Sequence, residues 1–204
     1  MSYRPTGTVY GVLMNFKAEL DALGDAVFAA PYKAPPQAPV LFIKTANTWV
    51  ASGGQTAIPD GATQLEGGAP IGMVMGAAGQ VAGYVLMNDL SIPHTSFFRP
   101  PVKLKCTDGL LGMGPTVTAD AKLLDWQLQV WVNGALRQSA DFSQLVRGPQ
   151  QLVADVSDFM QLCEGDVLML GSAPGRPVAS AGDHIRITAG GLAALDHYLV
   201  EATI

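Results

Sequence analysis

The chain has 204 residues, of which 49% are hydrophobic and only 14% are charged, and its formal net charge at pH 7 is −5. Its basic residues form no stripe that suits a phosphate backbone, and no apolar run approaches the roughly 18 residues of a membrane helix. We therefore expect no nucleic-acid and no membrane partner, and we expect a cytoplasmic protein whose apolar surface packs in an oligomer.

A weak helix and three strands are predicted in the first half of the chain. Leu20, Leu23 and Val27 lie at helical spacing in KAELDALGDAVF, where Gly24 disfavours the helix. Continuous apolar runs at residues 40–43, 71–75 and 83–88 are typical of strands that are buried on both faces. The 23 glycines and 14 prolines fall between such runs, which indicates short strands with irregular connections.

A polar stretch follows the third of these strands in a chain that is otherwise poor in charge. Its ionisable residues are Asp89, His94, Arg99, Lys103, Lys105 and Asp108. Side chains at the end of a buried strand are held rigidly beside a loop that can approach a ligand, so this stretch is a candidate site. A solvated loop would explain the same composition.

The second half of the chain is predicted to hold a hairpin, a helix and two more strands. In WQLQVWVNGALRQSA, apolar residues alternate along the chain, and Asn133-Gly134 suits the two positive φ angles of a type I′ turn. A helix begins at Pro149 in PQQLVADVSDFMQL, with Phe159 on its apolar face. DVLML at residues 166–170 and HIRIT at residues 184–188 are short strands. Together these elements predict a mostly β fold with a few helices.

Several common cofactor and nucleophile motifs are missing from the sequence. It contains no dinucleotide-binding loop, no P-loop and no nucleophile elbow. Cys106 and Cys163 belong to no CxxC pair. His94, His184 and His197 lie far apart, so we expect each of them to pack against strands or lie at the surface rather than bind a metal.

Taken in order, several stretches resemble the fumarylacetoacetate hydrolase family. They are IGMVMG, GYVLMNDLS, FFRPPVKLKCTDG with GMGP, the Asn-Gly hairpin, LGSAPGRP and GDHIRITAGGLAALDHYLV. The resemblance is narrowest to the amino-terminal half of the decarboxylase/isomerases of 4-hydroxyphenylacetate (homoprotocatechuate) catabolism. It implies a mixed β-sandwich roll, with an amino-terminal flap over residues 1–38 and a single globular unit over residues 39–204.

The resemblance also implies a divalent metal, Mg²⁺ or Mn²⁺, held by two glutamates of an E-x-E strand and an aspartate of the next strand. Such a cation would chelate a 2-oxo acid and stabilise an enolate. Asp89 matches the aspartate, but the glutamate positions fall at Gly68 and Pro70, which offer no side-chain ligand. Glu66 lies two residues before the first position. We therefore expect this chain alone to hold a metal poorly.

The flap departs from the family pattern as well. Glu19 stands at the histidine place and Ala22 at the glutamate place of the stretch that activates water in hydrolases of the family. The loss of this acid/base pair makes carbon–carbon hydrolysis the less favoured reaction.

The remaining candidate residues follow from the same resemblance. Arg99, Lys105 and Ser172 are candidates for binding substrate, because Arg99 and Lys105 can pair with carboxylates. Lys105 and Asp108 are candidate catalytic residues, and Lys105 would stabilise a developing enolate by its charge. The alternative is that Lys105 and Asp108 pair with each other and only order the loop.

The function that the resemblance implies is that of an amino-terminal subunit of a decarboxylase/isomerase. Its substrate would be an unsaturated oxo-di- or tricarboxylate of the 5-carboxymethyl-2-oxo-hex-3-ene-1,6-dioate type. It would work as a homo-oligomer or with a metal-competent sister chain. Two alternatives stay open: a non-catalytic structural homologue that acts through its oligomer interface, and a stand-alone hydrolase of 2-oxo acids.

Overall fold

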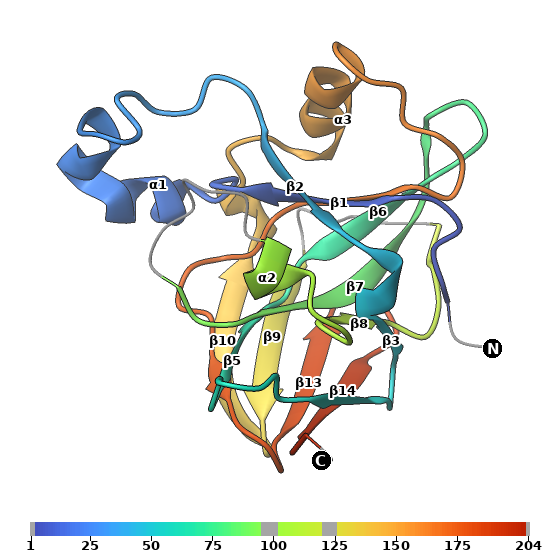
Figure 1. The fold of residues 1–204 in the computed structure, drawn as a ribbon. Helices are drawn as coiled ribbons and strands as arrows, with labels where there is room; N and C mark the ends of the chain where they lie inside the picture. Colours follow the sequence, from blue (N-terminus) through green and yellow to red (C-terminus); the bar gives the residue numbers. More distant parts are fainter. Residues whose placement is uncertain (1–2, 95–101, 120–125, 203–204) are drawn as a thin grey trace.

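The computed structural model describes residues 3–94, 102–119 and 126–202. These residues form two curled β-sheets that pack on each other, with the helices at their edges (Figure 1). The mostly β fold predicted from the short apolar runs is confirmed.

The larger sheet is built around β7 (Val81–Ser91), which pairs antiparallel with β5, β6 and β8. Within the described residues it has nine strands, in the order β12-β5-β7-β6-β11-β1-β2, with β8 beside β7 and β3 beside β8. The other strands are β1 (Val9–Leu13), β2 (Val40–Lys44), β3 (Trp49–Ala51), β5 (Leu65–Gly68), β6 (Ile71–Met75), β8 (Leu111–Met113), β11 (Val167–Met169) and β12 (Val178–Ala179).

The smaller sheet has the order β10-β9-β13-β14-β4. The predicted hairpin is confirmed in it, because Asn133 and Gly134 have φ angles of 50° and 77° between β9 and β10. The strands are β4 (Gln55–Ala57), β9 (Gln127–Val132), β10 (Ala135–Asp141), β13 (His184–Ala189) and β14 (Leu195–Val200).

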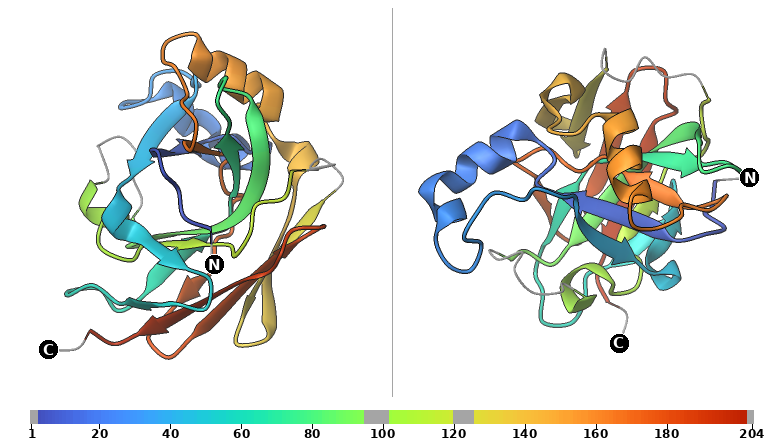
Figure 2. Two further views of the ribbon diagram at one scale, coloured as in Figure 1. Left: turned by 90° about the vertical axis from the view of Figure 1, so that its right-hand side faces the viewer. Right: turned by 90° about the horizontal axis from the view of Figure 1, so that it is seen from above.

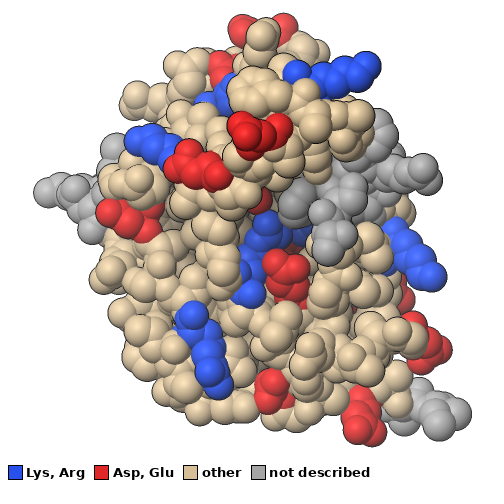
Figure 3. Space-filling model, turned by 90° about the vertical axis from the view of Figure 1, so that its left-hand side faces the viewer, with Lys and Arg blue, Asp and Glu red and all other residues tan. Residues whose placement is uncertain are grey.

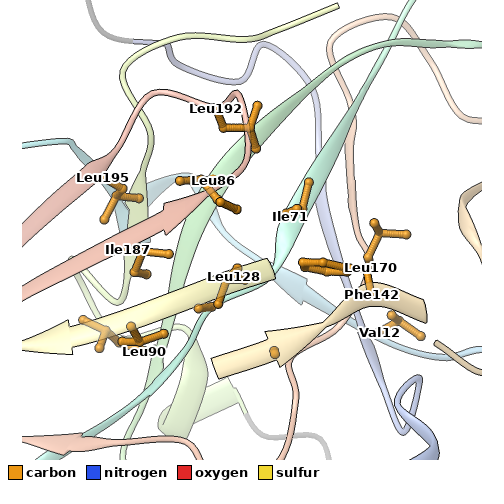
Figure 4. Close-up of a cluster of buried hydrophobic side chains, with 14 of the residues drawn as sticks. Val12, Ile71, Leu86, Leu90, Leu128, Phe142, Leu170, Ile187, Leu192 and Leu195 are labelled. Carbon is orange, nitrogen blue, oxygen red and sulfur yellow. The ribbon is translucent and has the colours of Figure 1, made fainter. Parts of the chain in front are cut away.

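The main core fills the space between the two sheets. Figure 4 shows Leu86 of β7 in this cluster, near Leu128 and Ile187 of the smaller sheet. The opposite face of β7 is buried too, since Val85 and Met87 belong to a second apolar cluster. Each buried side chain of this size stabilises the fold by roughly 1.5–3 kcal/mol. Burial on both faces, predicted from the continuous apolar run, is therefore confirmed for β7.

The helices lie outside the sheets and agree with the sequence only in part. The structure has α1 (Lys17–Leu23), α2 (Val102–Lys105) and α3 (Pro149–Ser157), with 3-10 turns η1 (Gly24–Phe28), η2 (Ala46–Thr48) and η4 (Phe142–Gln144). Figure 2 shows α1 and η1 extending away from the sheets. No helix in the described part of the chain is long and apolar enough to cross a membrane.

Two helix predictions need correction. The helix expected in KAELDALGDAVF ends at Leu23, because Gly24 adopts a positive φ of 47° there and the chain continues as the 3-10 turn η1. The later helix begins at Pro149 as predicted, but it ends at Ser157, before the expected apolar position Phe159. That side chain is 61% exposed.

Candidate functional site

Asp89 lies inside β7, where that strand is paired on both edges. Its Cα partners are Gly68 of β5 and Leu111 of β8. The sequence placed Asp89 at the end of a strand, but β7 continues to Ser91. The carboxylate is therefore held by sheet backbone on both sides, and it is buried.

Two buried lysines contact the Asp89 carboxylate. The Nζ of Lys44, at the end of β2, lies 2.9 Å from Oδ1, and the Nζ of Lys105, at the end of α2, lies 2.7 Å from Oδ2. Lys44 also donates to the carbonyls of Leu90 (2.9 Å) and Lys105 (2.6 Å). The Lys105 Nζ lies 4.6 Å from the centre of the Phe42 ring, a cation–π contact. We call Lys44, Asp89 and Lys105 the Asp89 cluster.

The pKa values within the Asp89 cluster favour its charged form. Burial raises the pKa of Asp89, but the charges and hydrogen bonds of Lys105 and Lys44 outweigh burial and bring that pKa down to about 2. Burial lowers the pKa of Lys44 to about 8, although the charge of Asp89 opposes this. Asp89 is therefore a carboxylate at neutral pH, with a cation already at each oxygen.

A small recess lies beside the cluster. Its cavity volume is about 10 Å³, and Asp89, Pro70, Ser172, Glu19 and Arg176 are among its lining residues. Ser172 comes to the recess because the chain turns directly after β11, where Gly171 has a φ of 92°. The recess therefore joins Asp89 and Ser172, which the sequence had singled out, to Arg176, which it had not, and to Glu19, which it had named only as a departure from the family pattern.

Arg176 connects two acidic side chains at this recess. Its Nη2 donates to Oε1 of Glu19 at 3.0 Å, and its Nε lies 3.5 Å from Oε1 of Glu66. Burial raises the pKa of Glu19, although the charge of Arg176 opposes the shift. A carboxyl group with a raised pKa holds a proton more readily than an exposed glutamate does.

Position 68 faces Ser172 at very short range. A Cβ atom added to Gly68 would lie 2.6 Å from the Ser172 Oγ and 3.3 Å from the Asp89 carbonyl oxygen. A side chain at this position would force Ser172 to move. The position of Ser172 therefore depends on the absence of a side chain at Gly68.

The other predicted site residues are distributed differently. Lys105 pairs with Asp89, whereas the exposed Asp108 carboxylate accepts a hydrogen bond from Asn47. Arg99 lies outside the described residues. The structure thus brings Lys105, Asp89 and Ser172 to one place and leaves Asp108 apart from them.

Sequence reasoning missed Lys44 and Arg176. Lys44 ends the apolar run VLFI. The prediction that this run is buried on both faces is wrong, because Ile43 of β2 is 50% exposed while the next residue, Lys44, is buried. Arg176 lies in the turn-rich stretch GSAPGRP and meets Glu19 across 157 positions of sequence. A single sequence contains no local pattern that predicts such a contact.

A second polar group is buried on the other face of β7. The Nε2 of His197 lies 2.7 Å from the Thr56 hydroxyl, and its Nδ1 lies 3.2 Å from the Asn88 amide nitrogen. Since Thr56 donates its proton to the Gly109 carbonyl, it accepts from Nε2–H, and Nδ1 accepts from Asn88. Burial lowers the pKa of His197 to about 4. His197 is therefore a neutral packing residue of β14.

The donor set for a metal is small. Among the residues that the structure describes, no three His, Cys, Asp or Glu side chains gather so that they could hold a metal ion. Asp89 is the carboxylate at the expected place, and Gly68 and Pro70 have no donor atoms in their side chains. The other polar side chains that line the recess beside Asp89 are those of Ser172, Glu19 and Arg176.

The chain is similar in sequence to bifunctional catabolic enzymes. It is 35% identical to the 4-hydroxyphenylacetate degradation bifunctional isomerase/decarboxylase of Escherichia coli, in a match that covers 96% of this chain and 47% of that protein. It is 34% identical to the protein of the same name from Salmonella dublin, covering 95% of this chain and 47% of the relative. The chain therefore spans about half the length of these curated relatives.

Solved structures share the fold. The structure superposes on the 5-carboxymethyl-2-hydroxymuconate delta-isomerase of Mycobacterium smegmatis with a TM-score of 0.84 at 24% identity, covering 98% of this chain and 79% of that one. For the fumarylpyruvate hydrolase of Pseudomonas aeruginosa in complex with Mn²⁺ and pyruvate, the TM-score is 0.80 at 22% identity, covering 97% and 91%. These likenesses confirm the β-roll that the sequence implied.

The family model described as fumarylacetoacetate (FAA) hydrolase C-terminal matches residues 8–200. This match covers both sheets, the Asp89 cluster and the recess beside it. The chain belongs to the fumarylacetoacetate hydrolase family.

Proposed function

We propose that this chain is the amino-terminal half of an isomerase/decarboxylase of 4-hydroxyphenylacetate catabolism. Its substrate is an unsaturated oxo-di- or tricarboxylate of the 5-carboxymethyl-2-oxo-hex-3-ene-1,6-dioate type. The observation that carries the proposal is the relation to the isomerase/decarboxylases, which extends over 96% of this chain but only 47% of the Escherichia coli protein. A metal-competent sister chain supplies the missing half and the Mg²⁺ or Mn²⁺ site.

The recess supports a role in binding and proton transfer. In the proposed complex, Ser172 and Arg176 orient a substrate carboxylate, together with Arg99. Isomerisation moves a proton from one carbon of the unsaturated acid to another, and Glu19 accepts and returns that proton. Burial already raises the pKa of Glu19, which favours this task.

The proposed roles of Lys105 and Asp108 are revised accordingly. Lys105 is fully buried against Asp89 and does not line the recess, so it acts on the substrate only through Asp89. Asp108 orders the segment after α2 through its contact with Asn47. Both are therefore positioning residues in this proposal.

The role of Glu19 is tested by Glu19→Gln in the reconstituted two-chain enzyme. We expect kcat for isomerisation to fall by about 10²-fold or more, because the amide cannot accept a proton. The matched control is Glu66→Gln, which alters the other partner of Arg176 and should leave kcat nearly unchanged. In the parent enzyme the rate should rise with pH through the raised pKa of Glu19, and the variant should lose this limb of the profile. Equal rates for the two variants would remove Glu19 from the mechanism.

A second candidate function is that of a structural partner without chemistry of its own. It is favoured by the ion pairs of the site, because each of its charged groups is already paired within the chain. The cations are Lys44, Lys105 and Arg176, and the carboxylates are Asp89, Glu19 and Glu66. The two functions are separated by mixing the chain with a sister chain that carries an intact E-x-E strand and following the absorbance of the conjugated substrate. If Glu19→Gln, Ser172→Ala and Arg176→Ala complexes all keep the full rate, the structural function is the correct one.

A further inference from the structure

In the Asp89 cluster, the negative charge of the carboxylate is neutralised by the ammonium groups of Lys44 and Lys105. The Lys105 ammonium donates a hydrogen bond to Oδ2 at 2.7 Å, and the Lys44 ammonium lies 2.9 Å from Oδ1 as an ion pair without hydrogen-bond geometry. The two lysine side chains are 0% and 1% exposed. A buried carboxylate without a partner is strongly destabilising, so some cation is needed at this place. Lys44 and Lys105 supply that charge from within the chain.

The lysines are held in position by further contacts. Lys44 is bonded to two backbone carbonyls, those of Leu90 and Lys105. The Lys105 ammonium lies over the Phe42 ring. Since the carbonyl of Lys105 also belongs to α2, the Lys44 ammonium ties α2 to β7 as well as neutralising Asp89. These contacts fix the ammonium groups independently of any ligand.

The two glutamate positions beside Asp89 supply no side-chain ligand for a metal. At the first glutamate position, a Cβ on Gly68 would meet the Ser172 Oγ at 2.6 Å. At the second, the side chain of Pro70, another residue that lines the recess, has no metal-binding atom. A divalent cation at Asp89 would have to displace the two ammonium groups. It would gain the carboxylate of Asp89 and no ligand from positions 68 and 70, which is too few oxygen ligands for tight binding of Mg²⁺ or Mn²⁺.

We propose that the ammonium groups of Lys44 and Lys105 replace the divalent cation in this chain. They hold Asp89, the middle of β7 and α2 in one arrangement, and the chain folds and keeps this arrangement without metal. This inference does not depend on the proposed substrate or on the activity of any assembly.

The first test is the response of the purified chain to metal. We expect the melting temperature to be the same in EDTA and in excess Mg²⁺ or Mn²⁺, and we expect titration calorimetry with Mn²⁺ to show no saturable binding. A site on the folded chain would instead raise the melting temperature by about 5–10 °C at 100-fold excess over its dissociation constant. Micromolar Mn²⁺ binding, or a melting temperature that falls in EDTA, would overturn the proposal.

The second test compares variants within the cluster. Asp89→Asn leaves two buried ammonium groups without a counter-charge, and we expect it to lower the melting temperature by about 10 °C. Lys105→Met leaves Asp89 paired with Lys44 and should lower it less. The control is Asp155→Asn, which breaks the more exposed pair with Arg147 and should change it by only about 2 °C.

The order of these effects is the diagnostic result. If Asp89→Asn fails to fold while Lys105→Met folds, the order is still as expected. A wild-type-like Asp89→Asn variant, or a Lys105→Met variant that is the less stable of the two, would contradict a cluster in which the lysines neutralise Asp89.

Discussion

His197 shows how a single buried residue sets a pH limit on the fold. It is fully buried between Thr56 and Asn88, and burial lowers its pKa to about 4 from an ordinary 6.5. The unfolded chain therefore binds a proton at a higher pH than the folded chain does. The contribution of neutral His197 to the free energy of unfolding is therefore fully present above pH 6.5, and it is lost as the pH falls toward 4.

We predict that the free energy of unfolding decreases by about 2 kcal/mol between pH 7 and pH 4.5 through His197 alone. Denaturant unfolding at the two pH values measures this decrease. His197→Gln removes the titrating group. Between the same two pH values, the free energy of unfolding of the variant should therefore fall by about 2 kcal/mol less than that of the parent. Parallel curves for parent and His197→Gln would contradict the assignment.

At the scale of the elements, local patterns predicted those features that local interactions determine. Asn133-Gly134 specified the hairpin, Pro149 specified the start of α3, and continuous apolar residues specified the buried strand β7. The strands β3, β4, β8 and β12 have two or three residues each, and pairing with distant strands creates them. No periodicity develops over so short a length, so they could not be predicted.

The same limit applies to the candidate site. Asp89 and Ser172 were found because they match a pattern along the chain. The pairing of Asp89 with Lys44 and Lys105 was not predicted, because these lysines reach it from two other elements. The alternative pairing of Lys105 with Asp108 would have joined two residues that are close in the sequence. In the folded chain Lys105 instead pairs with the buried carboxylate of Asp89.

The hairpin gives a prediction at this scale. Gly134 has a φ of 77°, so Gly134→Ala should lower the free energy of unfolding by about 1 kcal/mol through backbone strain. Gly191→Ala is the matched control, since a Cβ there meets nothing within 4 Å and no positive φ is required. Denaturant unfolding of both variants measures the difference. Equal stabilities would mean that the turn does not impose the left-handed conformation.

For the whole molecule, the surface agrees with a protein that works in an assembly. Figure 3 shows one face on which Lys, Arg, Asp and Glu side chains are separated by broad areas without them. Large apolar side chains are exposed on the described surface, among them Phe28, Ile43, Val102 and Val178. Such side chains favour an interface, in keeping with the proposed half-enzyme that pairs with a sister chain.

The central claim is that this chain completes an isomerase/decarboxylase, and a titration of activity tests it most directly. A fixed amount of metal-loaded sister chain is titrated with this chain while the absorbance of the conjugated substrate is followed. The rate should rise and then level off at a simple stoichiometric ratio, and Glu19→Gln should level off at the same ratio with a much lower rate. A rate that does not change at any ratio, with no complex on size-exclusion chromatography, would contradict the claim.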